Sequence, residues 1–180
     1  ANGTLGALLD DRGTPWTSID RSRVMLQTGH GPRVLGDASR LPFADGVFGG
    51  VAALYMLYHF DDPLVPIREA YRVLRPGGLF AAAAPSRFDS PEFAAYLPPT
   101  ADTFDAESAP ALLARVFEEV WIEPWDALLI RLPDASAVES YLVGRQTPAS
   151  QARTIAAQVT TPLWVRKRGA VAWGRRALPS

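Results

Sequence analysis

The chain has 180 residues, 48% hydrophobic and 21% charged, with a net charge of −1; this balance suits one globular domain and leaves no room for a second full one. The sequence has no cysteine and two histidines, which excludes disulfides and argues against cysteine-ligated or histidine-rich metal sites. No apolar run approaches the ~18 residues that cross a bilayer, and no signal-peptide pattern opens the chain, so we expect a cytoplasmic location.

Short apolar runs alternate with helical stretches along the chain, which is the pattern of a parallel sheet with crossover helices. We predict strands at residues 17–19, 33–35, 50–54, 79–84 and 120–125, with a final pair of strands within 163–175. We predict helices at residues 5–11, 21–27, 63–74, 109–116, 135–144 and 149–158. The proline-rich segment 86–110 is predicted to be a long loop, and together with the inserted helix 135–144 it would form a lid.

Basic residues gather at the C-terminal end of the chain. Residues 1–139 contain 11 Lys or Arg against 19 Asp or Glu, whereas residues 140–180 contain 7 basic residues and no acidic ones. Such a cluster suits contacts with nucleic-acid phosphates, but it also suits cations on an exposed strand edge that discourage aggregation. We favour the second interpretation, because VRKRGAVAWGRR predicts two short strands around a turn at Gly169.

Three motifs follow one another between residues 36 and 78: GDASRLPFADGVF, an apolar run that ends in LYMLYHF, and EAYRVLRPGG. Together they resemble the second half of the nucleotide-binding core of class I S-adenosylmethionine-dependent methyltransferases that act on small molecules. The resemblance implies an α/β fold with a doubly wound, mostly parallel, Rossmann-like sheet and an antiparallel C-terminal strand. It also implies one domain, in which residues 1–84 bind the cofactor and residues 85–180 form the substrate side.

The N-terminus departs from this family pattern. The opening ANGTLG is similar to the last part of a glycine loop, in which Asn2 and Gly3 would approach the methionine part of the cofactor. The strand that should precede this loop, with its acidic residue and first glycine, is absent from the sequence. Because that strand lies in the middle of the family's sheet, we expect the chain to be a fragment or to lack its true start.

The resemblance assigns the remaining cofactor contacts to the ends of three strands. Asp20 would bind the ribose hydroxyls, although an aspartate there also suits the N-cap of the helix 21–27, and Arg21 would flank the adenine. Asp37 and Ala38 would bind the adenine amino group and ring, although Asp37 also suits a turn after a strand.

The third strand contributes Ala53 and Leu54, through backbone and apolar contacts. Open α/β sheets bind ligands at the carboxyl ends of their strands, so we expect Asp20, Asp37 and Leu54 to share one edge.

His59 follows the strand 50–54 and is a candidate general base, because histidine changes charge near neutral pH. A base is needed only when the acceptor is a poorly ionised hydroxyl or amine. The alternative is a structural histidine within the turn that precedes residues 61–63.

The leading function is therefore transfer of a methyl group from S-adenosylmethionine to oxygen, nitrogen or carbon of a small organic acceptor by in-line displacement. S-adenosylhomocysteine would be the product, and no metal is expected. One alternative is an RNA or protein methyltransferase that uses the basic C-terminal end, and another is a truncated, non-catalytic remnant of the fold. We expect no membrane or nucleic-acid partner, and a homodimer is compatible with the resemblance.

Overall fold

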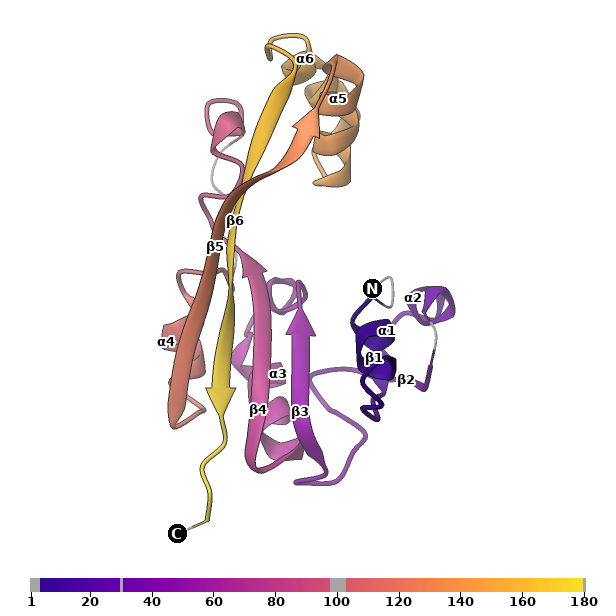
Figure 1. The fold of residues 1–180 in the computed structure, drawn as a ribbon, viewed down its shortest axis with the longest axis vertical. Coiled ribbons are helices and arrows are strands. Elements are labelled where there is room, and N and C mark those ends of the chain that lie inside the picture. The colour runs from indigo at the N-terminus through magenta and orange to yellow at the C-terminus, as the bar shows by residue number, and fades with distance from the viewer. Residues whose placement is uncertain (1–3, 30, 98–102, 180) are drawn as a thin grey trace.

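The computed structural model describes residues 4–29, 31–97 and 103–179 (Figure 1). Its elements in chain order are α1 (Thr4–Asp10), β1 (Ser18–Asp20), α2 (Arg23–Thr28), β2 (Arg33–Leu35), β3 (Phe48–Leu54), η1 (Leu57–His59), α3 (Leu64–Val73), β4 (Leu74–Pro85), η2 (Pro91–Phe93), α4 (Ala109–Leu113), β5 (Glu119–Leu132), α5 (Ala135–Gly144), α6 (Ala149–Ala156) and β6 (Leu163–Arg175). None of the helices in these ranges has the length and apolar character of a membrane span.

The strands form two sheets that share no ladder within the described residues. The larger sheet has the order β3-β4-β6-β5, and β1 and β2 form a separate parallel pair. In the larger sheet β3 and β4 are parallel, whereas β6 runs antiparallel to both of its neighbours. The β1–β2 pair lies on the β3 side of the larger sheet (Figure 1). The expected α/β fold with an antiparallel C-terminal strand is confirmed.

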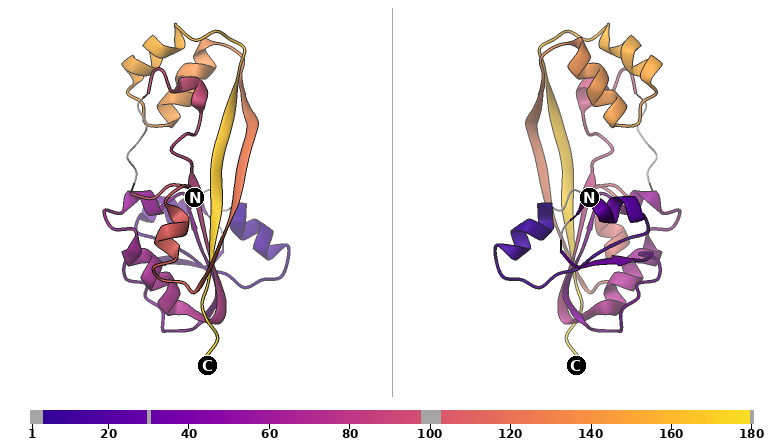
Figure 2. Two further views of the ribbon diagram at one scale, coloured as in Figure 1. Left: turned by 90° about the vertical axis from the view of Figure 1, so that its left-hand side faces the viewer. Right: turned by 90° about the vertical axis from the view of Figure 1, so that its right-hand side faces the viewer.

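One face of the larger sheet carries the main core. Helix α3 buries residues at helical spacing, among them Ile67, Ala70 and Val73, because one stripe of an amphipathic helix packs against the sheet. This stripe meets Phe80 of β4 and Leu113 of α4 in one cluster. Both helices lie on the same side of the sheet (Figure 2).

A second core lies at the far end of the molecule. Strands β5 and β6 pair as far as Leu132 and Leu163, well past the end of β4, and they carry α5, α6 and η2 there (Figure 1). We call η2, α5, α6 and these strand ends the distal lobe. Its buried cluster, which includes Phe93, Val138 and Val165, has no member in common with the main core.

The prediction of two strands around a turn at Gly169 is wrong. Strand β6 is continuous, and Gly169 pairs with Pro85 on one side and Trp125 on the other. A Cβ at Gly169 would lie 2.2 Å from the Trp125 ring and 2.6 Å from the carbonyl oxygen of Ala84. The glycine therefore makes room for a cross-strand tryptophan, and β6 lies inside the sheet instead of at its edge.

Strand β5 is also longer than predicted. The sequence predicts a strand at residues 120–125, whereas the ladder with β6 runs from Glu119 to Leu132. Pro124 lies within this strand and pairs with Ala170, because proline is tolerated on an edge strand, where its missing N–H can face away from the ladder. β5 is such an edge strand.

We expect Gly169→Ala to destabilise the protein, because the new methyl group overlaps the Trp125 ring and the backbone of β4. Overpacking of this kind costs about 1–3 kcal/mol. Gly144→Ala is the matched control, since nothing lies within 4 Å of a Cβ at the end of α5, and this change should be neutral or slightly stabilising. Thermal unfolding measures both variants, and equal melting temperatures for the two would contradict the assigned role of Gly169.

Candidate functional site

The carboxyl ends of β1 and β2 bring two predicted site residues together. The two strands pair in parallel, with Asp20 opposite Leu35. The backbone N–H of Gly36 then donates to the carbonyl oxygen of Asp20 at 3.1 Å, so Asp37 follows directly beside the end of β1. The structure therefore places Asp20 and Asp37 at the same end of this strand pair, as the sequence predicts.

Asp20 closes a local turn instead of capping the helix that follows. Its Oδ1 accepts a hydrogen bond from the N–H of Ser22 at 2.8 Å. Ser22 is the N-cap of α2, and its Oγ accepts from the N–H of Met25 at 3.3 Å. The alternative prediction that Asp20 is the N-cap of a helix starting at Arg21 is thus wrong, because Ser22 occupies that position.

Asp37 is held in a similar turn and is exposed. Its Oδ1 accepts from the N–H of Ser39 at 2.8 Å and from the Ser39 hydroxyl at 2.7 Å. These two hydrogen bonds lower the pKa of Asp37, because they favour the ionised carboxylate. Asp37 is accordingly a carboxylate at neutral pH.

In each aspartate, the hydrogen bonds to Oδ1 hold the carboxylate in place and so fix the position of Oδ2. Within residues 4–29, 31–97 and 103–179, no hydrogen bond reaches Oδ2 of Asp20 or of Asp37. Two acceptors at the same end of this strand pair fit the hydroxyl and amino donors of a nucleoside. The two acceptors therefore fit the adenosine part of S-adenosylmethionine.

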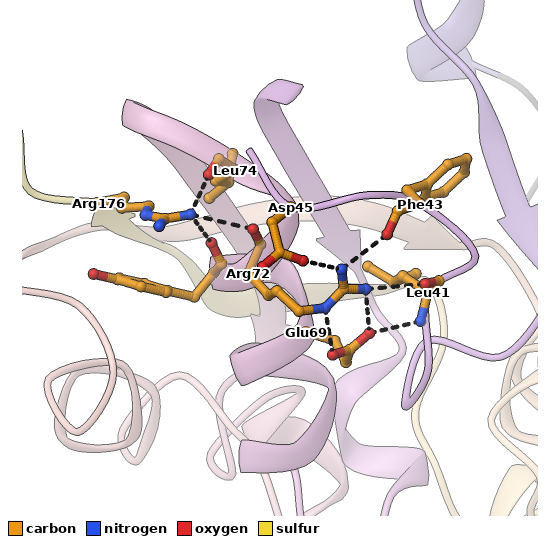
Figure 3. Close-up of polar contacts among 8 residues, drawn as sticks. Leu41, Phe43, Asp45, Glu69, Arg72, Leu74 and Arg176 are labelled. Atoms are coloured by element: carbon orange, nitrogen blue, oxygen red, sulfur yellow. Dashed lines mark hydrogen bonds and ion pairs between the residues drawn. The ribbon is translucent and has the colours of Figure 1, made fainter. Parts of the chain in front are cut away.

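The loop that follows Asp37 is held by one arginine of α3 (Figure 3). Arg72 donates from Nη2 to the carbonyl oxygen of Leu41 at 3.0 Å and from Nη1 to that of Phe43 at 2.8 Å. The same side chain binds Asp45 at 2.7 Å and both carboxylate oxygens of Glu69 at 2.8 and 2.9 Å. Glu69 also accepts from the N–H of Leu41 at 2.8 Å. The LPF and RVLRPGG motifs therefore form one hydrogen-bonded unit.

The charges of this unit stabilise each other. The hydrogen bond from Arg72 lowers the pKa of Glu69, and the hydrogen bonds that Arg72 donates to Glu69 and Asp45 raise the pKa of Arg72. The planar guanidinium fits this arrangement because it offers several donors in one fixed fork.

We expect Arg72→Lys to lower the melting temperature, although the positive charge is retained. A lysine has a single ammonium group and cannot reach two carbonyl oxygens and two carboxylates at once. Thermal unfolding and limited proteolysis between residues 39 and 48 measure the effect. Arg68→Lys on the same helix is the control, and an equal response of both variants would show that the fork of Arg72 is unimportant.

The third predicted contact, at the end of β3, belongs to the other sheet. Leu54 is 43% exposed there, Ala53 is partly buried, and no ladder joins β3 to β1 within the described residues. The structure thus does not join these residues to Asp20 through a common sheet. Arg21 is exposed and Ala38 is partly buried, whereas Asn2 and Gly3 lie outside the described residues.

The turn after β3 contains the candidate base. His59 ends η1, is exposed, and packs the edge of its ring against Tyr58 with 4.5 Å between ring centroids. Tyr55, at the start of the turn, adopts a left-handed backbone conformation with φ of 54° and donates its N–H to Ala83 at 2.9 Å. Such a conformation is uncommon for a non-glycine residue and occurs often near functional sites. No sequence signal predicts it.

Trp16 is a structural residue near the site that the sequence analysis missed. Its indole N–H donates to Asp10 of α1 at 2.6 Å. A Cβ at Gly6 or at Gly31 would lie within 2.5 Å of its ring, so both glycines allow the ring to pack closely. Trp16 thereby fixes α1 against the chain that enters β1. The two glycines and Trp16 are visible in the sequence, but their contact is not.

The basic residues of the C-terminal end have partners within the chain. Arg166 and Arg168 both bind Asp126, at 2.6 and 3.0 Å, and Arg175 binds Glu119 at 2.8 Å. Lys167 pairs with Asp89. Arg176 donates to three carbonyl oxygens at the end of α3, those of Tyr71, Arg72 and Leu74. This arrangement does not support the alternative of nucleic-acid binding at this end.

The described residues contain no group of three His, Asp or Glu side chains that could hold a metal ion. An open pocket of about 330 Å³ lies between Glu107, which precedes α4, and β5 and β6, where Trp125 and Arg168 line it. Its lining includes none of the predicted site residues. The candidate site is therefore defined by Asp20 and Asp37 and not by this pocket.

Comparison with known proteins finds similarity to one family in the N-terminal part. Residues 2–82 match the family described as "Methyltransferase domain". A demethylmenaquinone methyltransferase of Beutenbergia cavernae is 37% identical over 99 residues, which are 52% of this chain and 40% of that protein. The chain thus spans about two fifths of the length of this relative.

Solved structures share the fold over nearly the whole chain. An S-adenosylmethionine-dependent methyltransferase of Methanosarcina mazei superimposes with a TM-score of 0.64 at 17% identity, covering 99% of this chain and 89% of that one. The cyclase SpnF gives a TM-score of 0.63 at 18% identity, covering 96% and 71%. Likeness at this level shows the fold alone, and because a cyclase shares it, the chemistry must be argued from the site.

Proposed function

We propose that the chain belongs to the class I S-adenosylmethionine-dependent methyltransferases and that the complete protein transfers a methyl group from S-adenosylmethionine to a small organic acceptor. The observation that carries this proposal is the pair of carboxylates Asp20 and Asp37, each fixed by a turn and each with one oxygen free of described hydrogen bonds. A demethylmenaquinone is the first acceptor to test, because the relative from Beutenbergia cavernae is named for that substrate.

We assign binding roles to this chain's own residues as follows. Asp20 accepts from the ribose hydroxyls and Asp37 from the adenine amino group, with Arg21 and Ala38 beside the base. Ala53 and Leu54 line the site from the end of β3, and Asn2 and Gly3 approach the methionine part.

When bound, S-adenosylmethionine supplies a methyl carbon that is activated by the positive sulfur. Asp20 and Asp37 would hold its adenosine part, so that the activated carbon would be available for displacement by the acceptor. Holding the reactants collinear lowers the activation free energy by several kcal/mol. The proposal includes no metal. The homodimer and the cytoplasmic location remain predictions.

We expect Asp20→Ala and Asp37→Ala each to weaken binding of S-adenosylhomocysteine by the complete protein about tenfold or more, since a lost hydrogen bond to a ligand is worth roughly 1–3 kcal/mol. Isothermal titration calorimetry measures the affinity. Glu123→Ala on β5 is the control, because it removes an exposed carboxylate remote from this strand pair.

Asp37→Asn distinguishes the role of Asp37 in its own turn from its proposed contact with the ligand. The amide oxygen can take over the hydrogen bonds from Ser39, which leaves an NH₂ donor facing the adenine amino group. Affinity should therefore fall at least as far as in Asp37→Ala, with an unchanged melting temperature. If the wild-type complete protein does not bind S-adenosylhomocysteine, the non-catalytic remnant is the correct interpretation.

His59 is our proposed base for an acceptor that must lose a proton. We expect His59→Gln to reduce kcat by about 10²-fold or more, the usual contribution of a general base, while the affinity for S-adenosylhomocysteine stays the same. Single-turnover methyl transfer at several pH values measures this. A variant with wild-type rates at every pH would assign His59 a structural role.

A further inference from the structure

The distal lobe is joined to the main body by few connections. Its core and the main core share no residue, and the long β5–β6 pair is the principal link (Figure 1). The segment that leaves β4 also crosses between the two parts, from Ser86 to η2. The angle between lobe and body therefore depends on what holds this segment to the strands.

The crossing segment takes the place of β4 beside β6. The N–H groups of Ser86 and Ser90 donate to the carbonyl oxygens of Arg168 and Arg166, at 3.0 and 3.1 Å. In return, the N–H of Arg168 donates to Oδ1 of Asp89 at 2.8 Å. Each backbone group of β6 that loses β4 as its partner here thus gains another, as buried backbone groups require.

The second carboxylate oxygen of Asp89 connects a third element, helix α5, to the crossing segment and β6. Oδ2 accepts from Nη1 of Arg145, at the end of α5, at 2.7 Å and also from Nζ of Lys167 on β6. The Asp89 side chain is only 2% exposed. One buried carboxylate therefore connects the crossing segment, β6 and α5.

Lys167 has no capacity left for an external ligand. Its ammonium group contacts Asp89, the Ser90 hydroxyl at 3.2 Å and the Tyr141 hydroxyl at 3.1 Å, and these use all three of its donors. Tyr141 and Ser90 also share a hydrogen bond of 2.8 Å. The saturated network suits a structural connection and not an anion-binding site.

The network depends on the ionised form of Asp89. Burial raises the pKa of this carboxyl, but the hydrogen bonds from Lys167, the Arg168 amide and Arg145 outweigh burial and lower it overall. Removal of the carboxylate would leave two partly buried cations without their common partner, which is strongly unfavourable.

We propose that Asp89 is a positioning residue that fixes the distal lobe over the carboxyl ends of β3 and β4, and thereby shapes the acceptor half of the site. Figure 1 shows β3 and β4 pointing toward the end of the molecule that carries the lobe. The expected kinetic effect rests on the proposed methyl transfer, whereas the role of Asp89 in fixing the lobe does not depend on it.

The test is Asp89→Asn in the complete protein. The amide oxygen can still accept from Arg168, whereas the uncharged NH₂ group faces Arg145 and Lys167. We expect hydrogen exchange of the amides in α5 and η2 to accelerate about tenfold or more while exchange in α3 is unchanged, because the lobe loosens locally. The acceptor KM should rise about tenfold, and the affinity for S-adenosylhomocysteine should stay within twofold.

Asp126→Asn is the matched control, since it also removes one carboxylate charge that pairs with cations of β6, but at a 50% exposed position on β5 that binds Arg166 and Arg168. It should change neither lobe exchange nor the acceptor KM. Should Asp89→Asn fail to fold, Lys167→Met provides the second variant, with a smaller effect in the same direction.

Unchanged lobe exchange, or exchange that accelerates equally in α3, would overturn the proposal. An equal loss of acceptor and cofactor affinity would overturn it as well. Failure of the wild-type protein to bind S-adenosylhomocysteine would instead reject the proposed function, and the exchange measurements would still decide whether Asp89 holds the lobe.

Discussion

The fork of hydrogen bonds from Arg72 is the interaction on which the candidate site depends. The β1–β2 pair shares no ladder with the larger sheet in the described residues, so the segment after Asp37 must carry the spatial relationship between them. Arg72 and Glu69 fix that segment at Leu41, Phe43 and Asp45. The position of Asp37 relative to β3 thus follows from one side chain of α3, and the co-occurrence of the LPF and RVLRPGG motifs has a physical cause.

The parts of the fold that the sequence predicts well are those set by local patterns. Strand β2 and helix α5 begin and end where predicted, because apolar periodicity and the Asp134 cap are local signals. The pairing of Asp20 with the Asp37 turn also follows from topology, since both terminate neighbouring parallel strands. The N-cap of α2 is predicted two residues early, because Asp20 and Ser22 are both good capping residues and only the backbone decides between them.

Features that depend on distant partners could not be predicted. Gly169 indicates a turn in the sequence, yet its role is to admit Trp125 of the neighbouring strand. The contact between Lys167 and Asp89 joins residues 78 positions apart, so neither residue by itself indicates a buried network. The left-handed conformation of Tyr55 has no local signal either. In each case the missing information is which chain segment lies alongside.

The uneven distribution of charge along the sequence is also explained by contacts between distant segments. The C-terminal cations face carboxylates of the earlier strands and loops, since Asp126, Glu119 and Asp89 all lie before residue 139 and bind partners in β6. Excess charge in one segment of a sequence can therefore be balanced by tertiary pairing instead of by a polyanionic partner. Strand β6 lies between β4 and β5 and continues into the distal lobe, and the ion pairs of Asp89 with Lys167 and Arg145 connect the crossing segment to β6 and to the end of α5. The motifs of the N-terminal half form one hydrogen-bonded unit next to Asp37, whereas the distal lobe is held by charge pairs that no short motif records.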